Sequence, residues 1–319
     1  MVYLRLPALL LASVSFQWAL GAPLFGLFGD DDEDDVTTAV SAQTISDNFI
    51  RPAQFSRVAY CSSAAVTSWQ CGPPCDSIGK GVNVIQAGGD DGLVPMYFVA
   101  HDPTSNTIVV AHQGTEPKNF LSVLNDAQFL LVDLNTTRFT AAEGKDIQVH
   151  DGFQKTFERT ADGVLEGVQK GLASFGSSKV LVTGHSLGAS IATLDAMMLK
   201  EKLDPSVQVT TTVFGLPRVG NQEWADFVDA TLGSSFSFIT NQDDPVPIVP
   251  PRFLGYQHPS NEVHIKAVDD AGQATDVVAC QGQENGACSE GNSILSASIP
   301  NHLGPYFDDI SFGGKACPL

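Results

Sequence analysis

The stretch KVLVTGHSLGAS, residues 179–190, decides the fold because it changes from a strand pattern to a helix pattern around a serine. Its first residues are largely β-branched and apolar, and those after the serine are mostly small or apolar. Gly184 and Gly188 flank Ser186 and lack the Cβ atoms that would collide in a sharp strand–turn–helix connection. The pattern predicts that Ser186 is exposed at a helix N-terminus, where backbone N–H groups favour a developing oxyanion.

An alternative interpretation of the same letters is a serine that only caps a helix after a glycine turn. The β-branched strand before the turn favours the sharper connection. Ala189, Ser190 and Ala192 also favour it, because small residues let the helix pack closely. We therefore expect a nucleophile elbow at Ser186, and this serine needs a base elsewhere in the chain to become reactive.

Strand and helix patterns alternate along most of the chain, which predicts an α/β fold with a largely parallel sheet covered on both faces. The first two strands are expected to form a hairpin across residues 102–105. The expected strands cover residues 95–102, 106–114, 179–183, 207–215 and 236–240, and the expected helices lie within 152–175, 187–203 and 223–232.

The N-terminal segment is typical of secretion. Arg5 precedes an apolar run, residues 6–20, and small residues follow it, so we expect a signal peptide over residues 1–21 and an extracellular protein. A signal anchor is the alternative, but the run is short and no later segment approaches 18 uninterrupted apolar residues. Six acids, Asp30–Asp35, predict an acidic pro-segment or disordered N-terminus over 22–40, followed by one domain over 41–319.

The overall charge limits the class of partner. The formal net charge is −19, and it becomes −14 without residues 1–35, which hold six acids and one base. No basic patch suited to phosphate backbones remains. We therefore expect no nucleic-acid partner.

An even number of cysteines in a secreted chain favours disulfides. Short spacing suggests two local bridges and leaves the first and last cysteines to close a long loop. Zinc is the alternative, but the C-x3-C and C-x7-C spacings fit no common paired-ligand motif. Asn135 begins the one glycosylation sequon of the chain. The expected pairs are Cys71 with Cys75, Cys280 with Cys288, and Cys61 with Cys317.

The acid and base that a serine nucleophile needs are expected later in the chain. Asp243 and Asp244 follow an expected strand and precede a proline-rich loop, so a carboxylate lies at the carboxyl edge of the sheet. His258, His264 and His302 follow these acids. His264 alternates with apolar residues in a strand pattern, whereas the other two histidines lie in loop-like surroundings, and the residues alone do not choose between them.

Four segments, GHSLGAS, FGLPRVGN, DDPVPIVPP and IPNHLGPYF, resemble those of the fungal class 3 triacylglycerol lipases in order and approximate spacing, from about residue 45 to the end. The resemblance implies an α/β-hydrolase fold and a catalytic triad of Ser186, Asp244 and His302, without metal or cofactor. It leaves Asp243 as a solvated neighbour and His258 as non-catalytic. The family pattern also includes Cys61 with Cys317 and Cys71 with Cys75, whereas Cys280 with Cys288 rests on spacing.

The resemblance also implies an oxyanion hole and a lid. The backbone N–H of Leu187 is the first expected donor. Thr115 follows the strand 106–114 and is the second, although it can equally cap the next helix. An apolar patch on that helix, interleaved with polar residues, is expected to cover the site in water; the alternative is an ordinary core-packed amphipathic helix. The expected lid residues are Phe120, Leu121, Val123 and Leu124.

Together these features predict a secreted serine ester hydrolase of the triacylglycerol lipase type, with acylglycerols at a lipid interface as the expected substrate and a monomer as the expected state. A feruloyl or other soluble-ester esterase on the same scaffold is the first alternative. A catalytically silent lipid-binding protein is the second. His185, beside the nucleophile, is expected to pack structurally and not to act as the base.

Overall fold

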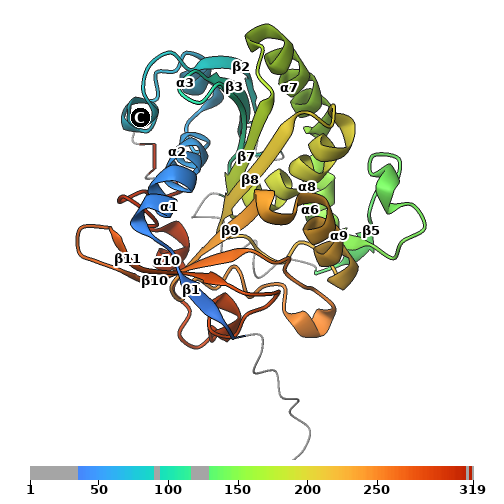
Figure 1. Ribbon diagram of the computed structural model, residues 1–319, viewed down its shortest axis with the longest axis vertical. Coiled ribbons are helices and arrows are strands. Elements are labelled where there is room, and N and C mark those ends of the chain that lie inside the picture. Colours follow the sequence, from blue (N-terminus) through green and yellow to red (C-terminus); the bar gives the residue numbers. More distant parts are fainter. Residues whose placement is uncertain (1–34, 90–93, 116–128, 314–315, 318–319) are drawn as a thin grey trace, which may run out of the picture. The chain divides into compact units, whose positions relative to one another are not determined.

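The structure is a computed structural model that describes residues 35–89, 94–115, 129–313 and 316–317 of the chain (Figure 1). The expected signal peptide and most of the acidic segment lie outside the described residues. So do the expected lid residues Phe120, Leu121, Val123 and Leu124.

The central element is a nine-stranded sheet with the strand order β1-β11-β10-β9-β8-β7-β4-β3-β2. Its five middle strands are parallel, and both edges are antiparallel. The expected hairpin and the parallel centre are both confirmed. The parallel strands are β4 (Thr107–His112), β7 (Lys179–His185), β8 (Gln208–Phe214), β9 (Phe236–Asn241) and β10 (Glu262–Val268). The edge strands are β1 (Thr37–Ala39), β2 (Asn83–Gly88), β3 (Tyr97–Asp102) and β11 (Ala274–Cys280).

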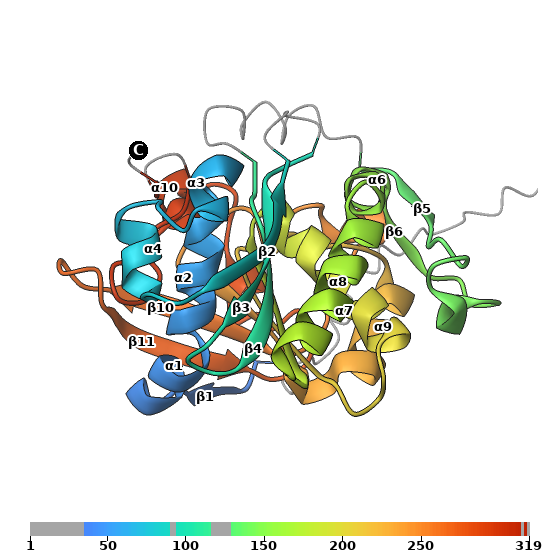
Figure 2. The same ribbon diagram turned by 90° about the horizontal axis from the view of Figure 1, so that it is seen from above.

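Helices cover both faces of this sheet (Figure 2). On one side lie α1 (Ala42–Asn48), α2 (Ile50–Val58), α3 (Ser63–Thr67), α4 (Pro73–Ile78) and α10 (Ile299–Leu303). On the other lie α6 (Asp151–Glu158), α7 (Ala161–Phe175), α8 (Leu187–Lys202) and α9 (Gln222–Leu232). A small second sheet pairs β5 (Leu131–Asp133) with β6 (Gln148–His150).

The alternation of side chains along β7 explains why the sheet has a core on each face. Val180 and Val182 join the cluster that contains the apolar residues of α8, whereas Leu181 packs against the cluster of Phe55 and Val58 from α2. A strand buried on both sides requires apolar residues at every position, which the sequence VLV supplies.

Two boundaries differ from the expectations. The helical spacing over 152–175 continues across a break at Thr160, whose hydroxyl and N–H both bond to the Phe157 carbonyl and end α6. Phe157 and Val164 still face one core cluster, so the apolar spacing conceals the break. The boundary placed at residue 40 is also too late, because Thr37–Ala39 pair with β11 as an edge strand.

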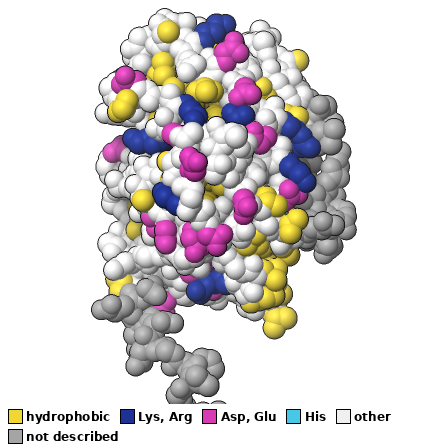
Figure 3. Space-filling view, turned by 90° about the vertical axis from the view of Figure 1, so that its right-hand side faces the viewer, with side chains coloured by type: hydrophobic (Ala, Val, Ile, Leu, Met, Phe, Trp, Pro, Cys, Tyr) yellow, Lys and Arg dark blue, Asp and Glu magenta, His cyan; other side chains and the backbone are white. Residues whose placement is uncertain are grey.

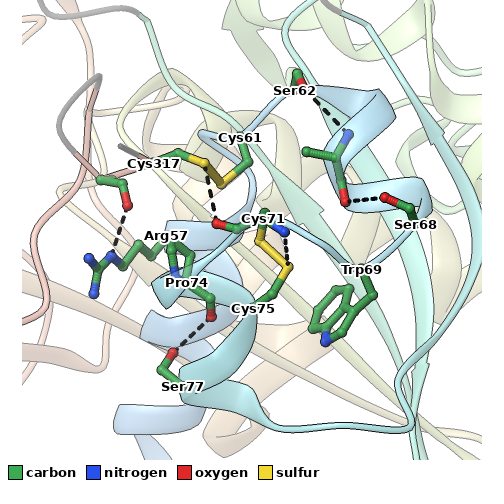
Figure 4. Close-up of a disulfide and its surroundings, with 12 residues drawn as sticks. Arg57, Cys61, Ser62, Ser68, Trp69, Cys71, Pro74, Cys75, Ser77 and Cys317 are labelled. Atoms are coloured by element: carbon green, nitrogen blue, oxygen red, sulfur yellow. Dashed lines mark hydrogen bonds between the residues drawn. A yellow bond between two sulfur atoms is a disulfide. The ribbon is translucent and has the colours of Figure 1, made fainter. Parts of the chain in front are cut away.

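The cysteines form the three expected pairs, Cys61–Cys317, Cys71–Cys75 and Cys280–Cys288. The first two lie side by side at the end of α2, where Arg57 Nε donates to the Ala316 carbonyl (Figure 4). The long-range bridge therefore fastens the C-terminal segment to the helix layer that carries α2.

Candidate active site

Ser186 occupies a strained turn between β7 and α8. Its φ of 61° and ψ of −128° are rare for a residue with a side chain. A Cβ at Gly184 would lie 2.4 Å from the Gly188 carbonyl oxygen, and a Cβ at Gly188 would lie 2.4 Å from that of His112. Both glycines are therefore required by close backbone contacts, as the elbow pattern predicts.

Ser186 differs from the expectation in one respect, because it is buried, with 3% of its surface exposed. The segment that leaves β4 passes over it, and a Cβ at Gly114 would lie 2.8 Å from Ser186 Cβ. The turn does place the side chain at the edge of the sheet, but Gly114 lies against it.

Asp244 and His302 form a buried pair near the elbow. His302 Nδ1 lies 2.9 Å from Asp244 Oδ2, and Asp244 Oδ1 accepts a hydrogen bond from Val246 N–H at 2.8 Å. Asp244 follows β9, while His302 lies on α10, so residues 58 positions apart meet. The Val246 contact and the imidazole together fix the carboxylate in one orientation.

The end of β8 brings His302 close to the elbow. Ser186 N–H donates to the Phe214 carbonyl at 2.9 Å. The next residue is Gly215, and a Cβ there would lie 2.9 Å from His302 Cε1. The imidazole therefore lies against the backbone that holds Ser186.

The other candidate acid and histidines lie elsewhere. Asp243 is exposed beside the buried Asp244. His258 is buried against Phe238, and its Nε2 lies 2.8 Å from the Pro247 carbonyl. His264 lies in β10, and its Nδ1 is 2.8 Å from the Thr240 hydroxyl. Burial lowers the pKa of both histidines to about 4, so each is neutral near pH 7.

Leu187 and Thr115 both lie next to residues of the elbow. Leu187 is the first residue of α8, so its backbone N–H has no acceptor within the helix. Thr115 is partly buried and follows Gly114, which lies against Ser186. This arrangement places the backbone of both expected oxyanion donors near the serine.

The chain can be compared with known proteins on this basis. A family model described as lipase (class 3) matches residues 109–254. The secreted mono- and diacylglycerol lipase MDL3 of Malassezia globosa is 33% identical over 274 residues, which are 85% of this chain and 84% of that protein. The chain belongs to the class 3 lipase family. A Malassezia restricta relative, the secreted mono- and diacylglycerol lipase LIP2, is 36% identical over 63% of this chain and 61% of its own length.

Solved lipase structures share the fold of this lipase over most of their length. Lipase II from Rhizopus niveus has a TM-score of 0.75 and 28% identity, covering 88% of this chain and 99% of that one. Lip2 lipase from Yarrowia lipolytica has a TM-score of 0.75 and 26% identity, covering 88% and 97%. The fold is therefore that of the α/β-hydrolases. The lipase is secreted, as its relatives are, and its three disulfides suit an oxidising compartment.

A buried charge cluster, which sequence analysis did not identify, holds the loop that follows Asp244. Arg218, from the segment FGLPRVGN, donates to the carbonyls of Val249 and Pro250 and pairs with Glu284 and Glu290. Burial opposes ionisation of Glu284, but the hydrogen bonds from Arg218 prevail and lower its pKa to about 2. The cluster stabilises the backbone on which Asp244 depends. The available signal was an arginine within FGLPRVGN, one of the segments that carry the family resemblance.

The remaining predicted sites have clear placements in the lipase. Asn135 is partly buried, and its Nδ2, where a glycan would attach, donates to Glu158 at 2.8 Å. Among the described residues, the side chains of metal-ligand type that come close together are Glu262, Cys280 and Cys288. The two cysteines share a disulfide, so they offer no thiolate. No helix in the described part of the chain is both long and apolar enough to cross a membrane.

Proposed function

We propose that this lipase hydrolyses acylglycerols at lipid–water interfaces, with Ser186 as the nucleophile, His302 as the general base and Asp244 as the acid that orients the imidazole. The observation that carries the proposal is the buried 2.9 Å contact of His302 Nδ1 with Asp244 beside the serine elbow. A related lipase of 25% identity and TM-score 0.73 is described as having a serine protease triad as its catalytic centre. The names of the Malassezia relatives support mono- and diacylglycerols as substrates.

The mechanism follows from these roles. His302 removes the Ser186 proton as the hydroxyl oxygen attacks the ester carbonyl, and Asp244 stabilises the imidazolium that forms. The N–H groups of Leu187 and Thr115 stabilise the oxyanion. Collapse of the intermediate breaks the ester bond, and His302 returns the proton to the departing alcohol. A water molecule then attacks the acyl-enzyme with the same base and releases the fatty acid.

Exposed apolar side chains in the loops that follow Asp244 and precede His302 support action at a lipid surface. Phe253 is 85% exposed and Leu295 is 96% exposed. Such large side chains gain free energy when a lipid phase removes them from water. On the face drawn in Figure 3, hydrophobic side chains gather at one corner, while acidic and basic ones are interspersed over the rest.

The two exposed tips belong to loops that contact or continue from the segment around Asp244. The loop with Leu295 is fixed at Asn292, whose Nδ2 donates to the Gln242 carbonyl at 2.6 Å, and at Ser298, whose N–H donates to Asp243. The loop with Phe253 continues from the segment that begins at Asp244. Contact of these tips with lipid would therefore bring the triad towards the interface.

The test compares a triacylglycerol emulsion, a soluble short-chain ester and methyl ferulate, using the wild type and Ser186→Ala. We expect emulsion hydrolysis to dominate, to rise when the ester exceeds its solubility, and to fall by about 10⁶-fold in Ser186→Ala, by analogy with a serine protease nucleophile. Preference for methyl ferulate would support the esterase alternative. Failure of a fluorophosphonate to label Ser186 would support a silent lipid-binding protein.

Substitutions at the two exposed apolar residues test the contact with lipid. The pair Phe253→Ser and Leu295→Ser should lower the ratio of emulsion activity to soluble-ester activity, because it removes apolar area from the loops beside the triad. The matched control is Val36→Ser, which alters an exposed apolar side chain beside β11. If the ratio of emulsion to soluble-ester activity is the same in the wild type, the double variant and Val36→Ser, lipid contact through these loops is contradicted.

A further inference from the structure

A chain of buried hydrogen bonds lies behind the proposed triad and joins three distant segments. The Tyr60 hydroxyl, just after α2, lies 2.6 Å from His185 Nδ1 at the end of β7. His185 Nε2 lies 2.8 Å from the His302 carbonyl oxygen on α10. All three side chains are buried. The proposed mechanism uses neither Tyr60 nor His185.

The chemistry of the acceptor fixes the direction of this chain. A carbonyl oxygen can only accept, so the proton of His185 is on Nε2. Nδ1 of the neutral ring then accepts from the Tyr60 hydroxyl. Burial lowers the pKa of His185 well below its ordinary value, and the charge of His302 acts in the same direction. His185 is therefore a fixed neutral donor, and not a second base.

The acceptor end of the chain is a short helix that needs external support. Helix α10 has five residues, and Gly304 ends it. Asn241 Nδ2 donates to the carbonyls of Asn301 and Pro305, at 2.8 and 3.1 Å. The His302 carbonyl accepts from His185 and, at 3.2 Å, from the Tyr306 hydroxyl. Buried donors thus position the backbone on both sides of the imidazole.

The other end of the chain meets the segment that carries the expected oxyanion donor. A Cβ at Gly114 would lie 2.6 Å from the Tyr60 hydroxyl oxygen and 2.5 Å from the His185 carbonyl oxygen. Tyr60 therefore lies where the elbow, the segment after β4 and the hydrogen bonds to α10 converge. A shift of its hydroxyl would therefore disturb the positions of all three.

We propose that His185 is a positioning residue for catalysis: oriented by the Tyr60 hydroxyl, its Nε2–H holds the backbone of His302 so that the imidazole keeps its place between Asp244 and Ser186. The inference rests on the proposed triad. It goes beyond the packing role that the sequence suggests for His185, because it assigns the effect to one hydrogen bond. Small displacements of a catalytic base have large kinetic effects, since proton transfer requires hydrogen-bond distance.

Two substitutions separate the hydrogen bond from the packing. His185 stacks on Phe312 with ring centroids 4.4 Å apart. His185→Phe keeps an aromatic ring and removes the donor, whereas His185→Gln keeps a terminal N–H donor and removes the ring. Tyr60→Phe removes only the hydroxyl. The readouts are kcat per titrated active site, KM for a soluble ester below its solubility limit, and the unfolding midpoint.

We expect His185→Phe to lower kcat by about tenfold or more with KM changed less than about twofold, and Tyr60→Phe to lower kcat by about two- to tenfold. His185→Gln should retain kcat within about threefold of the wild type. Equal or greater loss in His185→Gln than in His185→Phe would overturn the proposal in favour of packing. Unchanged kcat in His185→Phe would also overturn it.

The matched control is His264→Gln, which alters another buried histidine that bonds to Thr240 and has no place in the proposed site. It should lower stability and leave kcat per titrated site unchanged, and an equal kcat loss there would attribute the effect to general destabilisation and overturn the proposal. Ser186→Ala is measured in parallel. Full activity in that variant rejects the triad itself, whereas an inactive Ser186→Ala with a normal His185→Phe rejects only the positioning role.

Discussion

Two adjacent aspartates after β9 have different environments. Asp244 is buried against His302, and Asp243 is exposed. We predict that Asp244→Asn lowers kcat by about 10⁴-fold, by analogy with the same change in a serine protease triad, because the amide cannot stabilise the imidazolium. Asp243→Asn should stay within about twofold of the wild type, since solvent surrounds its side chain. Soluble-ester kinetics measure both, and comparable losses would reject the assignment of the acid.

The close backbone contacts of the elbow predict that its glycines cannot be replaced. Gly188→Ala places a methyl group 2.4 Å from the His112 carbonyl oxygen, where rigid backbone cannot yield. We expect a loss of about 1–3 kcal/mol or more in the free energy of unfolding, together with loss of activity. Gly163→Ala is the control, because its nearest neighbour is the end of the flexible Gln86 side chain at 3.0 Å. Urea unfolding should distinguish the two variants clearly.

The elbow was predictable because both of its glycines lie within two residues of Ser186. Gly184 lies against Gly188 in the same turn, whereas Gly188 lies against the backbone of His112 and Gln113. The choice of His302 over His258 instead required the family resemblance, since both lie in loops. The bonds of His185 to Tyr60 and His302 span more than one hundred residues each, so no local pattern reports them.

The two disulfides at the end of α2 close loops of very different length. Cys61–Cys317 spans 256 residues and Cys71–Cys75 spans four. We predict that replacing the first pair by serines costs about 2–4 kcal/mol of stability, and that replacing the second pair costs less, because loop-closure entropy grows with loop length. Chemical unfolding of the two double variants measures the difference. A larger loss from the short bridge would contradict the entropic argument.

The long central elements were predictable, and the short ones were not. Strands β7 and β8 are rich in β-branched residues, and α8 is rich in small and apolar residues, so each carries a strong pattern. Strand β1 has three residues and α10 has five, too few for a period to emerge. Tertiary contacts, such as those of Asn241 with the carbonyls around α10, stabilise these short elements.

Buried histidines make the stability of the whole protein depend on pH. Burial lowers the pKa of His150, His258 and His264 to about 4, from about 6.5 when exposed. Between these two pKa values, the histidines bind protons in the unfolded chain but not in the folded chain. The free energy of unfolding should therefore fall as pH falls from about 6.5 to 4, by up to about 1.4 kcal/mol per pH unit for each histidine.

Urea unfolding between pH 7 and 4.5 measures this dependence. The wild type should lose stability throughout that interval, and His264→Gln should show a slope smaller by about one proton. Constant stability from pH 7 to 5 would show that the buried histidines titrate as exposed ones do. Below about 4.5 the pairing of Glu284 with Arg218 adds to the loss, because protonation of the carboxylate abolishes it.

The edge strand β1 limits how far the N-terminus can be trimmed. Thr37–Ala39 pair with β11, and the Val36 carbonyl accepts from Gln281 N–H and from Asn285. A processing protease that removes the expected signal peptide and the acidic run can cut up to about Asp35 without touching these bonds. A cut three residues further on would leave the backbone groups of β11 unpaired and open a sheet edge to other chains. The mature N-terminus of the secreted lipase should therefore lie at or before Val36, and the acidic run ends where the sheet begins.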